Sequence, residues 1–411
     1  MIAGALAMIG ALGASVAPAL AAPGAWWHLG SSAFPTQLQP GGKGYLVVSA
    51  INRGYEDADG ASSPIVLTDA LPPGLEVIAV DGRAKASWST AATQLPPLPI
   101  CGFTAHFVSC EYQGAVKPYA RLWMLLTVKV ATGAATSETS EANVNGGGAA
   151  AVTLQSPLDL AGGEVKYGVE HYELAPEEAG GSAATQAGTH PYQLTTTISF
   201  NKTERFAFVN PNEDIPFQPA PPREVNVKLP PGLIGNPTPF SQCTASQFAK
   251  AGEKHSNGCP QDTAVGYANI TIETTQALGV NVFSVPVFNL VPDHGEPARF
   301  GFTVEGSPVY LDTSVRTGGD YGITVHVASI TQVVALLESE VTFWGVPGDP
   351  RHDNSRGWWC GITEAAESGL EPCKLQEERH PQPLLVMPTS CTGPLQSSVE
   401  TDSWNDPSNV L

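Results

Sequence analysis

The element Leu-Pro-Pro-Gly-Leu occurs twice, at residues 71–75 and 229–233, and each copy directly follows a run typical of a β-strand. Two consecutive prolines fix φ and withhold two backbone donors, while the glycine permits positive φ, so the chain must leave a sheet at each copy. The sequence holds 42 glycines and 36 prolines among 411 residues. Both residues disfavour helix interiors, so a helical bundle or a Rossmann-type fold is not expected.

Runs rich in β-branched and aromatic residues lie between these turns. They cover residues 45–52, 64–69, 76–80, 104–108 and 122–130, and later 195–200, 224–229, 264–273, 280–290, 298–304 and 321–327. Residues 244–251 are the expected short helix, with Thr244 as N-cap. Short strands with turn signals every 8 to 12 residues, roughly, predict an all-β fold of tandem immunoglobulin-like antiparallel β-sandwich domains with long loops.

Changes in composition predict the domain organisation. The run Gly-Gly-Gly-Ala-Ala-Ala at residues 146–151 is too flexible for a packed element, so we place a boundary there. We expect a leader over residues 1–21, a β-sandwich repeat domain over 22–150 and a second β-sandwich over 151–345. Residues 346–411 are expected to form a loop-rich segment with cysteines, where a further module would begin. Because no closing element precedes Leu411, we expect a longer protein.

Residues 1–21 are apolar or small and have the character of a signal peptide. Ala19 and Ala21 fit the small-residue pattern of a signal-peptidase site. The alternative is an uncleaved anchor, because residues 2–22 reach the length of about 20 residues that crosses a bilayer. Either way the rest of the chain is expected to be exported, extracellular or displayed on the cell surface. Membrane attachment is expected only through residues 1–22 or a tail beyond Leu411.

The seven cysteines support export. They are Cys101, Cys110, Cys243, Cys259, Cys360, Cys373 and Cys391. None forms a Cys-x-x-Cys motif, which argues against a zinc ribbon or a thioredoxin-type redox site. Short spacings in an exported protein predict the local disulfides Cys101–Cys110 and Cys243–Cys259. Cys391 is expected to join Cys360 or Cys373, leaving one thiol free or bonded to a segment outside this sequence.

The charge balance restricts the partners. The chain has 20 Lys and Arg against 39 Asp and Glu, a net charge of −19. Nucleic acid and anionic membranes are therefore not expected to bind, because counterion release needs clustered cations on the protein. A cell-wall or extracellular glycan, or an extracellular protein, is the expected partner.

Four elements in residues 40–150 occur in the order found in a known family. They are Asn52-Arg-Gly54, Thr68-Asp-Ala-Leu-Pro-Pro-Gly-Leu75, the pair Cys101 and Cys110, and Glu141-Ala-Asn-Val-Asn-Gly-Gly-Gly148. This quarter of the chain resembles the bacterial surface repeat called domain of unknown function eleven. The resemblance implies an immunoglobulin-like, exported domain of the kind strung in arrays on the cell surface. Glu141 departs from the family, which usually has Asn there.

Residues 151–411 resemble the segment that accompanies such repeats in large secreted actinobacterial proteins of unknown function. The matching runs are residues 186–192, 229–237, 241–243, 315–322 and 343–347. The resemblance implies a role in the cell envelope and brings no catalytic residues with it.

The sequence shows no motif that carries catalysis. It lacks Gly-x-Ser-x-Gly, a P-loop and His-Glu-x-x-His, so no catalytic residue, metal ligand, cofactor site or cofactor is predicted. His190 is either a binding imidazole or, as we prefer, a loop side chain that fixes the entry to the next strand. Asp57 and Asp59 are interpreted as a solvated acidic loop in preference to a calcium site. Arg316 and Asp320 are interpreted as an ion pair across a glycine turn.

Two tryptophan pairs are candidates for ligand contact. Trp358 and Trp359, like Trp26 and Trp27, offer flat aromatic faces on which sugars can stack. The alternative is that they fill cores or the junction between domains, which is the commoner use of tryptophan in sandwiches. The sequence thus predicts an exported, non-enzymatic structural or adhesive surface protein. The alternatives are a carbohydrate-binding module of the envelope and an accessory part of an extracellular hydrolase.

Overall fold

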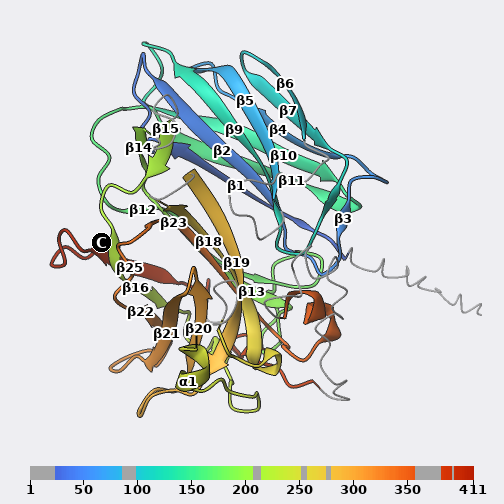
Figure 1. Ribbon diagram of the computed structural model, residues 1–411, viewed down its shortest axis with the longest axis vertical. Coiled ribbons are helices and arrows are strands. Elements are labelled where there is room, and N and C mark those ends of the chain that lie inside the picture. Colours follow the sequence, from blue (N-terminus) through green and yellow to red (C-terminus); the bar gives the residue numbers. More distant parts are fainter. Residues whose placement is uncertain are drawn as a thin grey trace, which may run out of the picture.

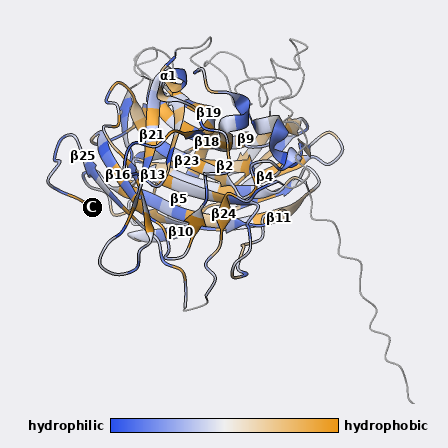
Figure 2. Ribbon diagram, turned by 90° about the horizontal axis from the view of Figure 1, so that it is seen from below, coloured by the Kyte–Doolittle hydropathy of each residue, from blue (hydrophilic) through white to orange (hydrophobic). Residues whose placement is uncertain are grey.

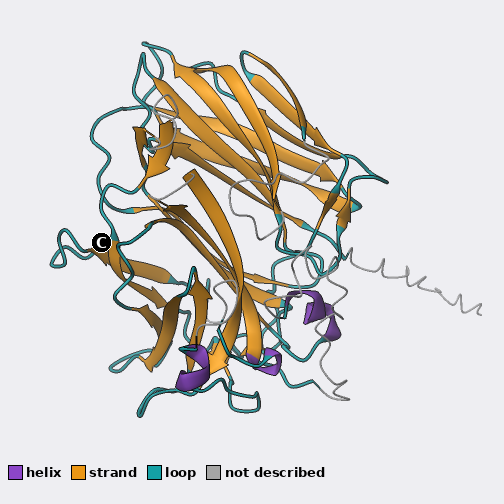
Figure 3. Ribbon diagram, viewed as in Figure 1, coloured by secondary structure: helices purple, strands orange, loops and turns teal. Residues whose placement is uncertain are grey.

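The computed structural model describes residues 24–85, 99–206, 214–250, 257–274, 279–356, 381–390 and 393–411, and these residues form mainly β-strands (Figures 1 and 3). The all-β prediction is confirmed. The expected helix is present as α1 (Ala245–Phe248), where Thr244 accepts a hydrogen bond from the Gln247 backbone N–H. Within the described residues, no helix combines the length and the hydropathy needed to cross a membrane. The predicted leader lies outside the described residues.

The first module is a sandwich of two antiparallel sheets. One sheet has the order β1-β2-β9-β5 and the other the order β11-β10-β4-β7-β6. The strands are β1 (Trp27–Phe34), β2 (Lys43–Asn52), β4 (Ile65–Ala70), β5 (Leu75–Lys85), β6 (Ile100–Thr104), β7 (Phe107–Tyr112), β9 (Arg121–Val130), β10 (Ser137–Gly146) and β11 (Ala149–Asp159). This is the ABED and GFC order of immunoglobulin domains, with the hairpin β6-β7 added beside strand C. A short pair, β3 (Ala58–Asp59) and β8 (Ala115–Val116), lies at one end.

The core of this sandwich follows from the alternation of inward and outward side chains along strands such as β9. Every second side chain of β9 is buried, namely Leu122, Met124, Leu126, Val128 and Val130. They join inward side chains of both sheets in one apolar cluster. Figure 2 shows apolar residues along the strands and hydrophilic ones in many of the connecting loops. Full burial of each such side chain contributes about 1.5 to 3 kcal/mol, so the alternating pattern fixes which face of each strand points inward.

The boundary predicted at residue 150 is wrong. Gly146, Gly147 and Gly148 have φ of 94°, 69° and 78°, and they form the tight turn between β10 and β11. The glycine run is therefore a hairpin turn that needs positive φ and not a linker. Strand β11 continues the first module as far as Asp159.

The second module is one ten-stranded antiparallel sheet with the order β12-β13-β23-β18-β19-β20-β21-β22-β16-β25. The strands are β12 (Val169–Glu177), β13 (Gln193–Phe200), β16 (Pro222–Lys228), β18 (Ala264–Thr274), β19 (Gly279–Leu290), β20 (Arg299–Val304), β21 (Ser307–Val315), β22 (Ile323–Val327), β23 (Ala335–Trp344) and β25 (Ser398–Ser403). Smaller elements are β14 (Thr203–Phe206), β15 (Asp214–Phe217), β17 (Ile234–Gly235), β24 (Leu385–Val386), η2 (Gln261–Thr263) and η3 (Pro350–Ser355).

This sheet curls until its two ends meet. Ile198 and Phe200 of β13 pack against Val225 and Val227 of β16, although the two strands lie near opposite ends of the sheet order. Sheets of about ten strands seldom stay open, because their twist accumulates. The segment predicted as loop-rich contributes β25, which pairs with β16, so residues after 345 are not all loop. This pairing was missed because the β25 sequence, Ser-Val-Glu-Thr-Asp-Ser, is mostly polar.

Both predicted disulfides are confirmed. Cys101 and Cys110 lie directly opposite each other in β6 and β7, with a Cα–Cα distance of 4.0 Å. Cys243 and Cys259 close a loop around α1, with a Cα–Cα distance of 5.3 Å. Cys360, Cys373 and Cys391 lie outside the described residues.

Removing the second disulfide should destabilise the fold measurably. Cys243→Ala combined with Cys259→Ala should lower the free energy of unfolding by about 3 kcal/mol, because the unfolded chain regains the entropy of a loop of that length. Urea unfolding of the full chain measures the loss. The pair Cys101→Ala and Cys110→Ala closes a shorter loop, 9 residues against 16, and should cost slightly less. An unchanged urea midpoint in both double variants would contradict the expectation.

Candidate functional site

Charged side chains are buried where the two modules meet. Arg53, directly after β2, is 0% exposed; its Nε donates to Glu340 Oε1 at 2.9 Å, and its Nη1 lies 3.6 Å from Glu177 Oε1. Arg121, at the start of β9, pairs with Glu340 Oε2 at 3.3 Å and with Glu338 Oε1 at 3.2 Å. Two guanidinium groups of the first module thus contact three carboxylates of the second, and we call these five residues the junction network.

The charges in this network depend on one another. Burial alone would raise the pKa of Glu340, but Arg53 and Arg121 hold that pKa below its ordinary value. Burial raises the pKa of Glu177 above its ordinary value, and Arg53 offsets only part of that effect. Buried charges need partners to compensate for lost hydration, so the modules can separate only if these groups regain water.

Tyr119 inserts from the first module into an apolar cluster of the second. It lies in the loop between β8 and β9 with φ of 60°, and its ring stacks on Tyr267 with centroids 4.6 Å apart. Its hydroxyl donates to Gln193 Oε1 at 2.9 Å and accepts from Trp344 Nε1 at 3.0 Å. Trp26 adds an edge contact to Tyr192, with centroids 5.4 Å apart. The junction therefore combines ion pairs with apolar packing.

A cleft of about 1240 Å³ lies beside the junction network. The outward face of β1, β2 and β9 forms one wall, which includes His28 and Trp123, and β12, β13 and β23 form the other. Burial, helped by Arg53, lowers the pKa of His28 to about 3, so its imidazole is neutral. Trp123 Nε1, Thr271 Oγ1 and Arg121 Nε are buried there without hydrogen-bond partners among the described residues.

One group in the cleft has the composition of a serine–lysine pair. Lys202 Nζ donates to Ser199 Oγ at 2.8 Å and also contacts Glu170 in a short ion pair. An ammonium group that donates to a hydroxyl and a carboxylate has no lone pair with which to accept the serine proton. We interpret the arrangement as a structural ion pair between β12 and the end of β13. The Lys202 backbone N–H also donates to Thr36 Oγ1 at 2.8 Å, which ties it to the first module.

The candidate contact residues that the structure describes, His190, Trp26 and Trp27, do not line this cleft. His190 Nδ1 lies 2.8 Å from the Leu385 carbonyl oxygen, which fits the preferred role as a loop-fixing side chain. Trp358 and Trp359 lie outside the described residues, whereas Trp26 and Trp27 are 3% and 4% exposed and are interior.

The acidic side chains noted in the sequence form contacts with residues close to them in the chain, as the following two examples show. Asp59 Oδ1 accepts the Ala61 backbone N–H at 2.9 Å, and Arg316 pairs with Asp320 at 2.6 Å across the glycine turn. Among the residues that the structure describes, no three His, Cys, Asp or Glu side chains are grouped so that they could hold a metal ion.

The junction network was not predicted from the sequence. Arg53 is interpreted there only as part of a turn, and none of the other four residues of the network is singled out. A signal did exist, because Glu338 and Glu340 lie on one face of β23, a strand whose other residues are mostly apolar. Two acids on one face of a buried strand require cations from another element.

Comparisons with known proteins give no family. No family profile matches the sequence, and no curated protein matches it. Among solved structures, a variant of the major pilin subunit BcpA of Bacillus cereus is similar at 8% identity and a TM-score of 0.25, over 46% of this chain and 64% of that one. The chain therefore spans less than two thirds of that pilin.

Two further solved structures are similar at the same level. The C-terminal domain of the AgI/II polypeptide BspA of Streptococcus agalactiae matches at 12% identity and a TM-score of 0.23, over 77% of this chain and 91% of that one. AvmM, a protein that catalyses macrocyclisation in alchivemycin A biosynthesis, is also similar. It matches at 11% identity and a TM-score of 0.22, over 34% of this chain and 90% of that one. At such TM-scores we draw no functional argument from these likenesses.

Proposed function

We propose that this chain is an exported, non-enzymatic structural or adhesive protein of the cell surface, whose two β-modules act as one rigid unit. The observation that carries the proposal is the junction, where the junction network and Tyr119 lock the modules together. A rigid unit holds its outer loops and strand edges at fixed positions toward a partner. Two disulfides support an oxidising compartment. The resemblance of residues 40–150 to a surface repeat family supports the same proposal.

Surface exposure and thiol state test this proposal in the cells that produce the protein. Trypsin added to intact cells should cleave the chain. The protein is then alkylated without a reductant and analysed by mass spectrometry. The four cysteines of the two disulfides should be unmodified, namely Cys101, Cys110, Cys243 and Cys259. A chain that is protected from trypsin and has all four thiols alkylated would overturn the proposal.

A second candidate function, glycan binding, is favoured by Trp123 in the cleft. Its indole Nε1 lacks a partner among the described residues, and the Arg83 guanidinium lies 5.6 Å from its ring centroid. The apolar face of a sugar can stack on such a ring, while the sugar hydroxyl groups form hydrogen bonds with polar side chains that line the cleft. On a glycan array, Trp123→Ala should abolish binding and Trp404→Ala, which alters an exposed tryptophan away from the cleft, should not. No bound glycan, or equal binding by both variants, would reject this candidate.

A further inference from the structure

The strand β6 forms an exposed, apolar edge of the first module. It is the last strand in the order β11-β10-β4-β7-β6. Strand β5 of the other sheet approaches it, and the Val77 N–H donates to the Ala105 carbonyl just after β6, but no described strand forms a ladder with the outer side of β6. Ile100 is 74% exposed and Phe103 is 47% exposed. Proteins usually protect such edges with charged residues or proline, because a free edge recruits other strands. The β6 sequence, Ile-Cys-Gly-Phe-Thr, has neither.

The main chain of β6 offers hydrogen-bonding groups to a further strand. Cys101 and Cys110 are opposite each other with a Cα–Cα distance of 4.0 Å. That value matches a non-hydrogen-bonded antiparallel pair, for which about 4.5 Å is usual, against about 5.5 Å for a hydrogen-bonded pair. The N–H and C=O groups of Cys101, and by alternation those of Phe103, therefore point away from β7. The disulfide holds the hairpin in shape, so little order has to be gained on binding.

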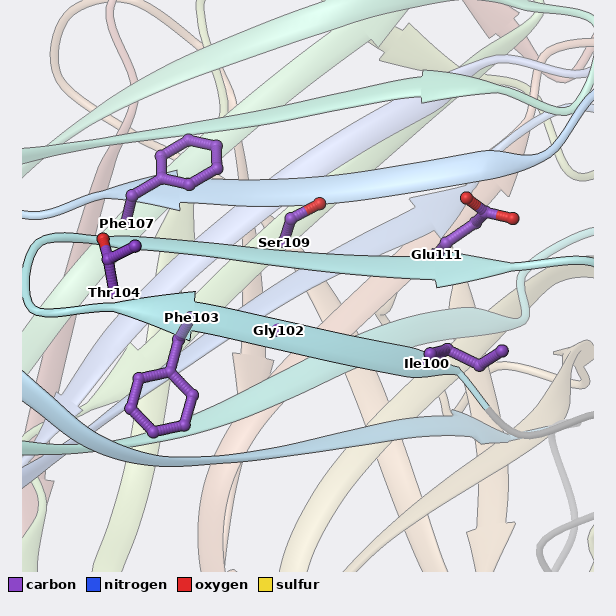
Figure 4. Close-up of a pocket in the computed structure, with 7 residues that line it drawn as sticks. All are labelled: Ile100, Gly102, Phe103, Thr104, Phe107, Ser109 and Glu111. Atoms are coloured by element: carbon purple, nitrogen blue, oxygen red, sulfur yellow. The ribbon is translucent and has the colours of Figure 1, made fainter.

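A groove crosses the exposed face of this hairpin (Figure 4). It has a volume of about 420 Å³, and Ile100 and Glu111 lie at one end with Thr104 and Phe107 at the other. Gly102 lies between them opposite Ser109, and a Cβ built on Gly102 would meet no atom within 4 Å. A long side chain from a neighbouring strand can therefore pass over Gly102 and reach the Glu111 carboxylate.

We propose that the edge of β6 binds an extended segment of an extracellular protein, which adds to the sheet as a further strand and carries Lys or Arg between apolar residues. This deepens the proposed adhesive function and rests on it. Main-chain pairing supplies affinity, and the groove over Gly102 selects the cationic side chain. The charge of the chain, −19, and Glu111 at the groove favour a cationic partner and oppose a second copy of this chain.

Peptide binding to the purified full chain tests the proposal. The probe is a fluorescein-labelled peptide that alternates valine with lysine, followed by fluorescence anisotropy. Phe103→Pro removes an N–H that points away from β7, so it should preserve the hairpin and weaken binding about tenfold or more. Glu111→Lys should weaken binding by a similar factor, about tenfold. Glu141→Lys makes the same charge change on the same sheet but outside the groove, and should leave the affinity within about twofold of wild type.

The outcomes separate this proposal from the proposed function. Failure of the wild-type chain to bind the peptide, or equal binding by Glu111→Lys and Glu141→Lys, would overturn the edge site. So would a wild-type dimer in sedimentation that Phe103→Pro dissociates, because the occupant would then be a second copy. Glu111→Lys changes a partly exposed side chain, and it keeps the test decisive if Phe103→Pro does not fold. Surface exposure and thiol state do not depend on whether the edge of β6 binds a peptide, so each proposal can fail without the other.

Discussion

Arg53→Met should lower the free energy of unfolding by about 3 to 5 kcal/mol, because it leaves buried carboxylates without their cation. Arg53 is 0% exposed and contacts Glu340 and Glu177, which are 2% and 7% exposed. Methionine keeps most of the side-chain volume, so the loss would reflect charge more than packing. Urea unfolding of the full chain at neutral pH measures it. The variant should also make the chain between Asp159 and Val169, which joins the modules, more sensitive to limited proteolysis.

Two further variants distinguish an unpaired charge from a general loss of packing. Arg53→Met combined with Glu340→Leu should recover much of the stability, since a buried ion pair replaced by apolar side chains is often nearly neutral. Lys228→Met breaks the pair with Glu400, whose side chains are 39% and 42% exposed, and should change stability by about 1 kcal/mol or less. A loss for Arg53→Met no larger than that for Lys228→Met would show that the junction network does not hold the modules together.

The features that could be predicted from the sequence are those encoded by neighbouring residues. Alternation in the run 122–130 fixes the inward face of β9, and the Pro-Pro-Gly elements end strands locally. Cys101 and Cys110 are 9 residues apart and Cys243 and Cys259 are 16 apart, so short loops suffice to pair them. The all-β class and both disulfides follow from such local information.

The sequence indicates that the acids of β23 need cations, but the identity of those cations could not be predicted because the partners are distant in sequence. Arg53 and Glu340 are 287 residues apart, and nothing near either residue specifies the other. The same reason hides the pairing of β16 with β25, whose polar sequence resembles a loop until a neighbour supplies the ladder. Glycines are ambiguous in another way, because residues 146–148 satisfy the composition of a linker and the φ requirement of a hairpin equally well. Only the pairing of β11 with β10 distinguishes them.

Asp69 should make the protein less stable as the pH rises. It lies on β4, is 0% exposed, and neither carboxylate oxygen has a hydrogen-bond partner among the described residues. Burial raises its pKa from an ordinary 3.8 to about 7. A raised pKa in the folded state means that folding favours the protonated acid. The stabilisation is therefore complete below about pH 4 and disappears as the pH rises through about 7.

The expected loss of stability is large, because a shift of one pKa unit corresponds to about 1.4 kcal/mol. Ionisation of Asp69 alone should lower the free energy of unfolding by about 4 kcal/mol between pH 4 and pH 8. Urea unfolding at pH 5 and pH 8 measures the slope. Asp69→Asn, which cannot ionise, should flatten it and be the more stable protein at pH 8, while the exposed Asp57→Asn should keep the wild-type slope. Equal slopes in all three proteins would exclude Asp69 as their source. Asp69 lies two residues before the first Leu-Pro-Pro-Gly-Leu element, so the strand that this element ends carries a buried acid into the core.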